Sequence, residues 1–425
     1  MSSYLFRNGH VIDPVTGVDG QRDLLIVDGV IDCIREHIGA SADETFDLDG
    51  AVIAPGFCDM HVHFREPGEE HKETLATGAL AAAAGGFTAV ACMPNTIPPL
   101  DTAEAVLSIR QKSDRFPVDI HPIGAITKGR EGRELAPIAE LHAAGAVAFS
   151  DDGTCLQNAK LLRIALDYAS VVDAPVIQHA EDAALSEGGA MNEGYMSTVL
   201  GLPGIPRIAE DGIVLRDMAV VEYVDGTYHL AHVSTASAVD AVRAAKVKGL
   251  RVTCEAAPHH FTLTDEAVRG YDTSTKVKPP LRTRDDVVAV KEAFRDGVID
   301  AIATDHAPHA AFEKEVEYVY APFGIIGLET AVGLAVTELV EQRYLTLWEL
   351  VERFSVNPRR ILRLPEIRIE EGMQANLTFF HPSREWSVDV RQFRSRSRNS
   401  PFHGMTLRGK PLGIVNKDQL VWLAE

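Results

Sequence analysis

Residues 52–63 read VIAPGFCDMHVH, an apolar run that ends in two alternate histidines, His61 and His63. Side chains two residues apart on a β-strand point to the same face and lie about 7 Å apart along the backbone, so both imidazoles can bind one metal ion. On a helix the same spacing would separate the two rings. An isolated His-x-His also arises by chance. The rest of the chain must therefore decide between a metal site and coincidence.

Short β-rich runs alternate with helix-like segments across the middle of the chain. The predicted strands are 52–59, 87–93, 118–126, 146–151, 175–180, 227–233, 251–256 and 298–305. The helix-like segments between them include 72–84, 102–113, 159–170, 236–248 and 284–295. Because the strands are too continuously apolar to have one face in water, these eight repeats predict a closed (β/α)8 barrel of the TIM type.

Metal-ligating side chains follow several of these strands. Active sites of such barrels lie at the C-terminal ends of the strands. The residues at those ends are His61 and His63, Asn95, Asp151 and Asp152, His179, His232, and Asp305 and His306. Nitrogen and oxygen ligands without sulfur suit zinc, with manganese, cobalt or iron as substitutes. Four of these histidines and two of the carboxylates make six ligands, which are too many for one tetrahedral zinc with an open position and fit two ions that share a bridging carboxylate.

Two metal ions about 3.5–4 Å apart hold a water molecule and lower its pKa toward 7, which makes hydroxide available to attack a carbonyl carbon. A carboxylate beside one ion can then carry the proton to the leaving nitrogen. Asp305 is the candidate for that role, and a purely structural ligand is the alternative. We expect His121 and His306 to pack outside the site, because adjacent strand positions face opposite ways. For His259 and His260 the sequence leaves two alternatives open: the pair lines the pocket, or it only packs in the core.

Composition limits the partners and the compartment. The 425 residues carry a formal charge of -20, which argues against nucleic acid or an anionic membrane as partner. The one basic cluster, 391–398, is interpreted as a solvated surface. Five scattered cysteines suggest neither a disulfide framework nor a thiolate zinc site, so a reducing cytoplasm is expected. No signal peptide and no apolar stretch of about 20 residues is apparent.

The two ends of the chain predict a second unit. Short alternating strands separated by Gly and Asp turns occupy the first 48 residues and return after about residue 367. Neither end is long enough for a good core of its own. We therefore predict a small β-sandwich domain from 1–52 and 367–425, beside a catalytic barrel over 53–366.

Six motifs carry a resemblance to a known family. They are DMHVHFREPG at 59–68, MPNT at 93–96, SDDG at 150–153, QHAED at 178–182, AHVST at 231–235 and ATDHAPH at 303–309. With these motifs the chain resembles, over essentially its whole length, the dihydroorotases of the long-chain, class I bacterial type in the amidohydrolase superfamily. The resemblance implies zinc-dependent interconversion of (S)-dihydroorotate and N-carbamoyl-L-aspartate in de novo pyrimidine (UMP) biosynthesis. It implies the same barrel and sandwich as well.

The resemblance also implies the role of each site residue. Two zinc ions per subunit would be held by His61, His63 and Asp305 on one side and His179 and His232 on the other, bridged by Asp152 and a hydroxide. Asp152, not Asp151, matches the family's ligand. The substrate contacts would be His63, Arg65, Asn95, His309, Phe323 and Gly324, with Arg65, Asn95 and His309 receiving the ring carboxylate. A surface salt bridge to Glu66 or Glu69 is the alternative for Arg65.

Two features of the pocket are left open. The family usually has asparagine where this chain has Lys278, whose longer cation either reaches the substrate carboxylate or turns to solvent. The segment 310–320 is long for a βα loop and charged, which predicts a mobile lid, with a static loop as the alternative.

Two rival functions remain. One is a hydantoinase or allantoinase, but those enzymes bridge their metals with a carboxylated lysine after strand four, where this chain has Asp151 and Asp152 and no lysine before Lys160. The other is a noncatalytic homologue that partners a carbamoyltransferase, which would be expected to have lost metal ligands. The resemblance further implies a homodimer and association with aspartate carbamoyltransferase.

Overall fold

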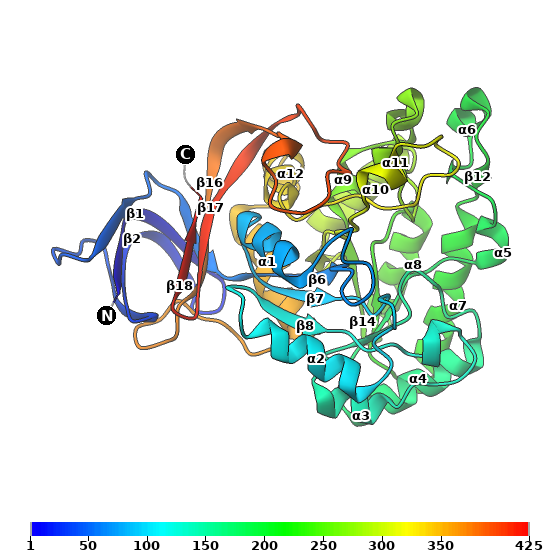
Figure 1. Ribbon diagram of the computed structural model, residues 1–425, viewed down its shortest axis with the longest axis horizontal. Helices are drawn as coiled ribbons and strands as arrows, with labels where there is room; N and C mark the ends of the chain where they lie inside the picture. Colours follow the sequence, from blue (N-terminus) through cyan, green and yellow to red (C-terminus); the bar gives the residue numbers. More distant parts are fainter. Residues whose placement is uncertain (1, 424–425) are drawn as a thin grey trace.

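The computed structural model describes residues 2–423 and contains a closed parallel barrel (Figure 1). Its strands are β6 (Phe57–Val62), β7 (Phe87–Cys92), β8 (Asp119–Pro122), β9 (Phe149–Ser150), β10 (Val176–Gln178), β13 (Tyr228–Leu230), β14 (Val252–Ala256) and β15 (Ala301–Ile302). Neighbouring strands in the orders β6-β7-β8 and β9-β10-β13-β14-β15 pair in parallel. Parallel bridges from Gly124 to Phe149 and from Val62 to His306 join the two groups. The predicted barrel is therefore confirmed.

Helices wrap the barrel on its outside (Figure 1). The longer ones are α1 (Leu75–Ala84), α2 (Ala103–Ser113), α3 (Ile138–Ala144), α4 (Ala159–Val171), α7 (Ile208–Val224), α8 (Ala236–Val247) and α10 (Arg284–Arg295). The shorter ones are α5 (Ala183–Ser186), α6 (Tyr195–Leu200), α9 (Pro258–Thr262), α11 (Ala311–Lys314), α12 (Ala331–Ala335), α13 (Leu347–Val351) and α14 (Asn357–Ile361). The hydroxyls of Thr102 and Thr235 accept backbone N–H groups at the starts of α2 and α8, which sets where these helices begin.

Both ends of the chain contribute to one further sheet, which forms the β-sandwich. Its strands are β1 (Ser3–Asp13), β2 (Val18–Val27), β3 (Val30–Arg35), β4 (Glu44–Asp47), β5 (Val52–Pro55), β16 (Asn376–Ser387), β17 (Thr406–Asn416) and β18 (Gln419–Trp422). The order is β18-β17-β16-β5-β1-β2-β3, with β4 on β1. β5 joins the ends, because it pairs in parallel with β1 and antiparallel with β16. A separate small pair, β11 (Met191–Asn192) and β12 (Gly204–Ile205), lies among the barrel loops.

The bounds predicted for the first barrel strand are wrong. The stretch 52–59 is two strands: β5 belongs to the sandwich sheet, β6 belongs to the barrel, and Gly56 separates them. Both halves are fully buried, so the apolar pattern could not reveal the change of sheet. The domain limits at 52/53 and 366/367 stay a prediction, and β5 extends the sandwich sheet a few residues past the first of them.

Gly56 lies where the two sheets meet and has no room for a side chain. A Cβ atom there would lie 1.8 Å from Asn376 Oδ1 and 2.1 Å from Thr88 Oγ1. We expect Gly56→Ala to lower the free energy of unfolding by about 1–3 kcal/mol through overpacking. Denaturant unfolding followed by circular dichroism measures the change.

The matched control is Gly212→Ala, inside α7, where no atom beyond the neighbouring residues and the helix's own backbone lies within 4 Å of the added methyl group. That variant should gain up to about 1 kcal/mol from helix propensity. Equal stability of the two variants would contradict the packing argument at Gly56.

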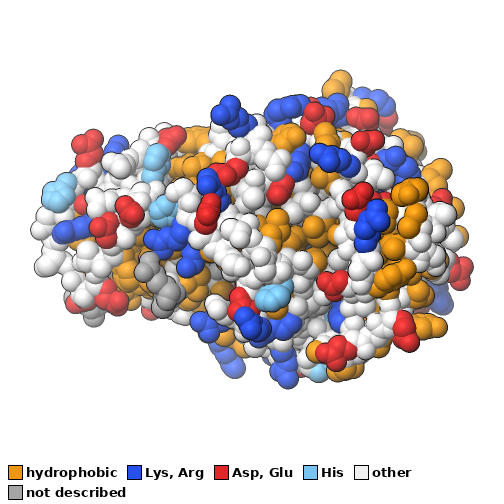
Figure 2. Space-filling model, turned by 90° about the horizontal axis from the view of Figure 1, so that it is seen from above, with side chains coloured by type: hydrophobic (Ala, Val, Ile, Leu, Met, Phe, Trp, Pro, Cys, Tyr) orange, Lys and Arg blue, Asp and Glu red, His pale blue; other side chains and the backbone are white. Residues whose placement is uncertain are grey.

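The charged side chains of the surface and the state of the cysteines are visible in the structure. Acidic and basic side chains are interspersed over the face that Figure 2 shows. All five cysteines are free, as their scattered spacing predicted. Within residues 2–423, no helix combines the length and the apolar character that a membrane crossing requires.

Candidate metal centre

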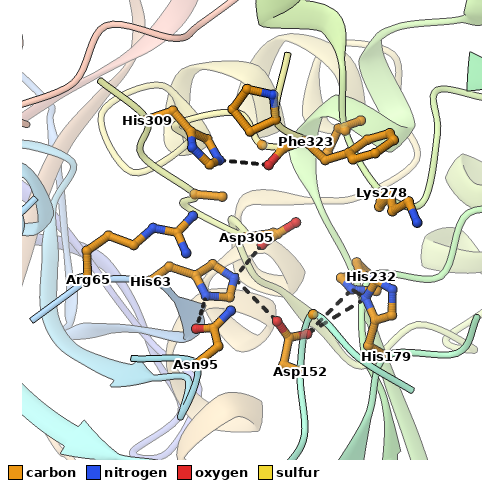
Figure 3. Close-up of a pocket in the computed structure, with 15 residues that line it drawn as sticks. His63, Arg65, Asn95, Asp152, His179, His232, Lys278, Asp305, His309 and Phe323 are labelled. Atoms are coloured by element: carbon orange, nitrogen blue, oxygen red, sulfur yellow. Dashed lines mark hydrogen bonds and ion pairs between the residues drawn. The ribbon is translucent and has the colours of Figure 1, made fainter. Parts of the chain in front are cut away.

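Five strand ends bring the six predicted metal ligands together, and Figure 3 shows all of them except His61. None of these residues is more than 6% exposed. They are His61 and His63 at the end of β6, Asp152 after β9, His179 after β10, His232 after β13 and Asp305 after β15. The barrel therefore gathers in one buried cluster residues that lie up to about 240 positions apart in the sequence.

Two overlapping groups in this cluster have metal-binding geometry, with all ligand atoms of a group within 4.8 Å of one another. One group is His61, His63 and Asp305, in which Asp305 Oδ1 lies 2.9 Å from His63 Nε2 and 3.5 Å from His61 Nε2. The other group is His61, Asp152 and His232. Two adjacent groups are the arrangement that a binuclear centre requires.

Asp152 lies between the two halves of the cluster. Its Oδ1 is 3.3 Å from His61 Nε2, and its Oδ2 is 3.5 Å from His63 Nε2. On the other side, His179 Nδ1 and His232 Nε2 lie 3.8 and 3.9 Å from Oδ1 and 2.8 Å from each other. One carboxylate thus faces the ring nitrogens of four histidines, which is the position of a bridging ligand.

Hydrogen bonding in the cluster is incomplete without an ion. Within residues 2–423, His61 Nε2 and Asp152 Oδ1 are buried and have no hydrogen-bond partner. Buried polar atoms are almost always paired, so such atoms call for a ligand. The donor set of imidazole nitrogens and carboxylate oxygens fits a divalent transition metal such as zinc.

The surroundings favour an ionised carboxylate at Asp152 and a neutral ring at His232, whereas at His61 burial is outweighed by Asp152 and Asp305, which hold the pKa of that ring well above its ordinary value. Burial disfavours the charged form of Asp152, but His61 and the other histidines outweigh it and hold the pKa of that carboxyl well below its usual range. Burial and the neighbouring His179 and His61 hold the pKa of His232 well below its ordinary value. Metal ligands must be ionised carboxylates and neutral imidazoles.

Two residues orient the histidines of β6, as second partners of metal-binding imidazoles commonly do. Glu255 Oε1 accepts a hydrogen bond from His61 Nδ1 at 2.8 Å, and Asn95 Oδ1 accepts one from His63 Nδ1 at 2.8 Å. Both rings therefore present Nε2 to the cluster. Burial opposes the ionisation of Glu255, but hydrogen bonds from His229 and His61 outweigh it and lower the pKa of Glu255 to about 2. The sequence analysis missed Glu255, whose signal was a carboxylate inside the apolar run 251–256.

A cavity of 380 Å³ opens above the cluster. All the predicted substrate contacts line it, namely His63, Arg65, Asn95, His309, Phe323 and Gly324. The Arg65 guanidinium points into the cavity between His309 and the cluster (Figure 3), with Nε donating to the carbonyl oxygen of Pro308 at 3.2 Å.

The alternative of a surface salt bridge at Arg65 is wrong. Arg65 is buried, and among residues 2–423 no carboxylate pairs with it. The two acidic neighbours are engaged elsewhere, Glu66 with Lys112 and Glu69 with Lys72.

His309 is held in a neutral, hydrogen-bonded state. Burial and the nearby charge of Arg65 lower the pKa of His309 to about 2. Its Nε2 donates to the carbonyl oxygen of Phe323 at 2.8 Å, so the one N–H of the neutral ring is already used. The contact between His309 and the substrate carboxylate stays a prediction. It requires that the His309 N–H leave the Phe323 carbonyl oxygen and donate to the carboxylate when substrate binds.

Lys278 lines the cavity but turns its cation away from the cluster (Figure 3). Its Nζ lies 2.7 Å from Glu181 Oε1 and 4.9 Å from the centre of the Phe323 ring. The ammonium group forms an ion pair and is not turned to solvent, and its contact with a substrate carboxylate stays a prediction. Both partners are only partly exposed at the edge of the cavity, which favours an ion pair.

Three further histidines, His259, His260 and His306, pack beside the ligands without lining the cavity. His306 turns toward Glu73, with 3.4 Å between Nε2 and Oε2. His260 Nε2 donates to the carbonyl oxygen of Pro279 at 3.0 Å, and the cavity lining includes neither His259 nor His260. The segment 310–320 contains α11, and Lys314 ties it down by donating to the carbonyl oxygens of Thr273 and Pro322. Its mobility stays a prediction.

Comparison with known proteins identifies the family. Residues 50–238 match the family model described as Dihydro-orotase-like. A dihydroorotase of Pelotomaculum thermopropionicum is 52% identical over 411 residues, which cover 97% of this chain and 96% of that protein. A dihydroorotase of Syntrophus aciditrophicus is 49% identical over 423 residues, which cover 98% of this chain and 99% of that protein.

Solved structures agree on the fold. An L-hydantoinase (dihydropyrimidinase) from Arthrobacter aurescens matches with a TM-score of 0.87 at 24% identity, over 100% of this chain and 98% of that one. A dihydropyrimidinase from Brevibacillus agri matches with a TM-score of 0.85 at 22% identity, over 99% of this chain and 95% of that one. At such identities the likeness shows the barrel and sandwich alone. With half of its residues shared over its full length, a buried His/Asp metal-binding cluster and this fold, the chain belongs to the dihydroorotase family of the amidohydrolase superfamily.

Proposed function

We propose that this chain catalyses the interconversion of (S)-dihydroorotate and N-carbamoyl-L-aspartate with two zinc ions, as a cytoplasmic step of de novo pyrimidine (UMP) biosynthesis. One observation carries the proposal: a single cavity joins the metal-binding cluster to a buried guanidinium without a carboxylate partner in residues 2–423. Dihydroorotate has both matching parts, a cyclic amide to be cleaved and a carboxylate to be bound.

The cluster would hold the ions from two sides. His61, His63 and Asp305 would bind one ion, His179 and His232 the other, and Asp152 both. When bound, the ions lower the pKa of water and so supply a nucleophile at neutral pH. The close approach of Asp305 to His63 and the central place of Asp152 support this division.

Side chains of the cavity perform the other tasks. Asp305 would take the proton of the attacking water and carry it to the ring nitrogen that leaves. Arg65 can offer two parallel donors to the ring carboxylate. Asn95 Oδ1 accepts a hydrogen bond from His63, so the Asn95 Nδ2 group would donate to the substrate. Backbone groups of Phe323 and Gly324 would contact the pyrimidine ring.

Rival functions have less support. A hydantoinase or allantoinase of the expected kind would need a bridging lysine, but Asp152 occupies that place and Lys160 is exposed on α4. A noncatalytic carbamoyltransferase partner would not be expected to keep six converging ligands. The homodimer and the association with aspartate carbamoyltransferase stay predictions.

The test is turnover by zinc-loaded protein in both directions, with hydantoin and allantoin as rival substrates. We expect activity on dihydroorotate and N-carbamoyl-aspartate alone, lost on chelation and restored by zinc, because the ions supply the nucleophile. Activity on a rival alone would overturn the substrate assignment. No activity on any of them by fully zinc-loaded protein would favour the noncatalytic homologue.

A further inference from the structure

The segment 393–400, hereafter the strap, runs from the sandwich to the rim of the barrel. It lies in the connection between β16 and β17, which Figure 1 shows in orange and red reaching toward the barrel. Its side chains alternate: Phe393, Ser395, Ser397 and Asn399 are buried, whereas Arg394, Arg396 and Arg398 are exposed. The arginines of 391–398 are exposed, as a solvated basic surface requires, but the side chains between them at 393, 395 and 397 are buried.

Two carboxylates of the barrel, the buried Glu73 and the partly exposed Glu329, fix the strap in place. Glu73, just before α1, accepts hydrogen bonds from Ser395 Oγ at 2.5 Å and from the Arg396 N–H at 3.1 Å. Glu329 accepts from the N–H groups of Arg394 and Ser395, at 2.9 and 3.0 Å. The strap therefore has a defined position on the barrel, and its last residues lie at the edge of the cavity.

Asn399 lies at that edge and is only 4% exposed. Its Oδ1 accepts from the backbone N–H of His309 at 3.1 Å. Its Nδ2 donates to the carbonyl oxygens of Ala307 and Gly324, both at 3.0 Å. Its own carbonyl oxygen accepts from the N–H of Ile326 at 3.1 Å. One residue of the strap thus joins the two loops that carry the proposed substrate contacts.

The two loops approach each other closely, and two hydrogen bonds of their own join them, from His309 Nε2 to the Phe323 carbonyl oxygen at 2.8 Å and from the Ala307 N–H to the Ile325 carbonyl oxygen at 2.9 Å. A Cβ atom on Gly324 would lie 2.7 Å from the Ala307 carbonyl oxygen and 2.9 Å from His309 Nε2. The carbonyl oxygens of Ala307 and Gly324 face the same amide nitrogen, so without a donor between them they would repel each other. A primary amide, with two donors beside an acceptor, matches this set of partners.

We propose that Asn399 is a positioning residue for substrate binding: it holds the 307–309 and 323–326 loops in register over the cavity. Through these loops it sets the places of His309, Phe323 and Gly324. It also sets the place of Arg65, whose Nε is bound by the Pro308 carbonyl oxygen between Ala307 and His309. This inference rests on the proposed function, since it assigns a supporting role to the same cavity.

The test compares Asn399→Ala with Asn416→Ala. Asn416 is 2% exposed and lies on β17, and its Nδ2 donates to the barrel carbonyl oxygens of Pro117 and Thr88 at 3.0 and 3.3 Å. It is thus a buried amide that ties the sandwich to the barrel through residues that do not line the cavity. Both variants should lose thermal stability, because each leaves backbone carbonyls without a donor.

Only Asn399→Ala should weaken substrate binding. We expect its KM for dihydroorotate to rise about tenfold or more, with bound zinc unchanged and kcat within about threefold of wild type. Asn416→Ala should keep the wild-type KM. If Asn399→Ala does not fold, Asn399→Asp replaces it, since a carboxylate keeps the shape and the acceptor but loses both donors.

Equal KM values in the two variants would show that Asn399 serves stability alone and would overturn the proposal. Loss of zinc from the Asn399 variant would overturn it too, because the effect would then pass through the metal cluster. The wild-type protein in the same assays separates these results from the failure of the proposed function, which would appear as absent turnover before any substitution.

Discussion

Asp152→Ala loses at least one of its metal ions, and its turnover of dihydroorotate falls on the order of 10³-fold or more. This is the expected result because Asp152 places its two oxygens 3.3 Å from His61 Nε2 and 3.5 Å from His63 Nε2. Its Oδ1 also faces His179 at 3.8 Å. Removing this carboxylate takes away the one negative group common to both halves of the cluster, so four histidines are left to bind cations without it.

The measurement is zinc per subunit by elemental analysis, together with kcat. The neighbouring Asp151→Ala is the matched control, since Asp151 is equally buried but accepts from the N–H groups of Ile126 and Thr127, at 2.9 and 3.0 Å, and from the Thr127 hydroxyl. That variant should lose stability and keep its zinc. Full zinc content in Asp152→Ala, or zinc loss only in Asp151→Ala, would refute the bridging role.

Asp305→Asn should keep most of its zinc and lose about 10²- to 10⁴-fold in kcat. The amide oxygen preserves the shape of the ligand that lies 2.9 Å from His63 Nε2, but an amide cannot accept and return a proton at neutral pH. Metal content and kcat measured on the same preparation distinguish a lost ligand from a lost proton carrier.

Asp300→Asn is the control at the opposite end of the same strand, where Asp300 accepts from the Cys254 N–H at 2.8 Å and pairs with Lys246. It should alter stability and leave kcat and zinc content near those of wild type. Wild-type turnover by Asp305→Asn would exclude the proton-carrier role, and complete loss of zinc would reduce Asp305 to a structural ligand.

The barrel could be predicted because each of its strands is a short apolar run that is recognisable locally. Even the short strands β9 and β15 fall inside predicted runs, 146–151 and 298–305. The failure at 52–59 has a clear cause. Every residue of β5 and β6 is buried, so the pattern of apolar residues carries no information about which sheet each strand joins. That choice depends on β1 and β16, which flank β5 from opposite ends of the chain.

The sequence alone determined the chemistry of this protein: a parallel barrel, histidines and carboxylates at the ends of its strands, and an arginine beside them. These follow from residue type and short spacing, which act within one strand and the turn after it. Only the tertiary structure decided which groups orient the ligands and close the cavity. Glu255 lies 194 positions from His61, and Asn399 lies 90 positions from His309. Such hydrogen bonds exist only once the barrel has closed and the strap has packed on it, so no local pattern encodes them.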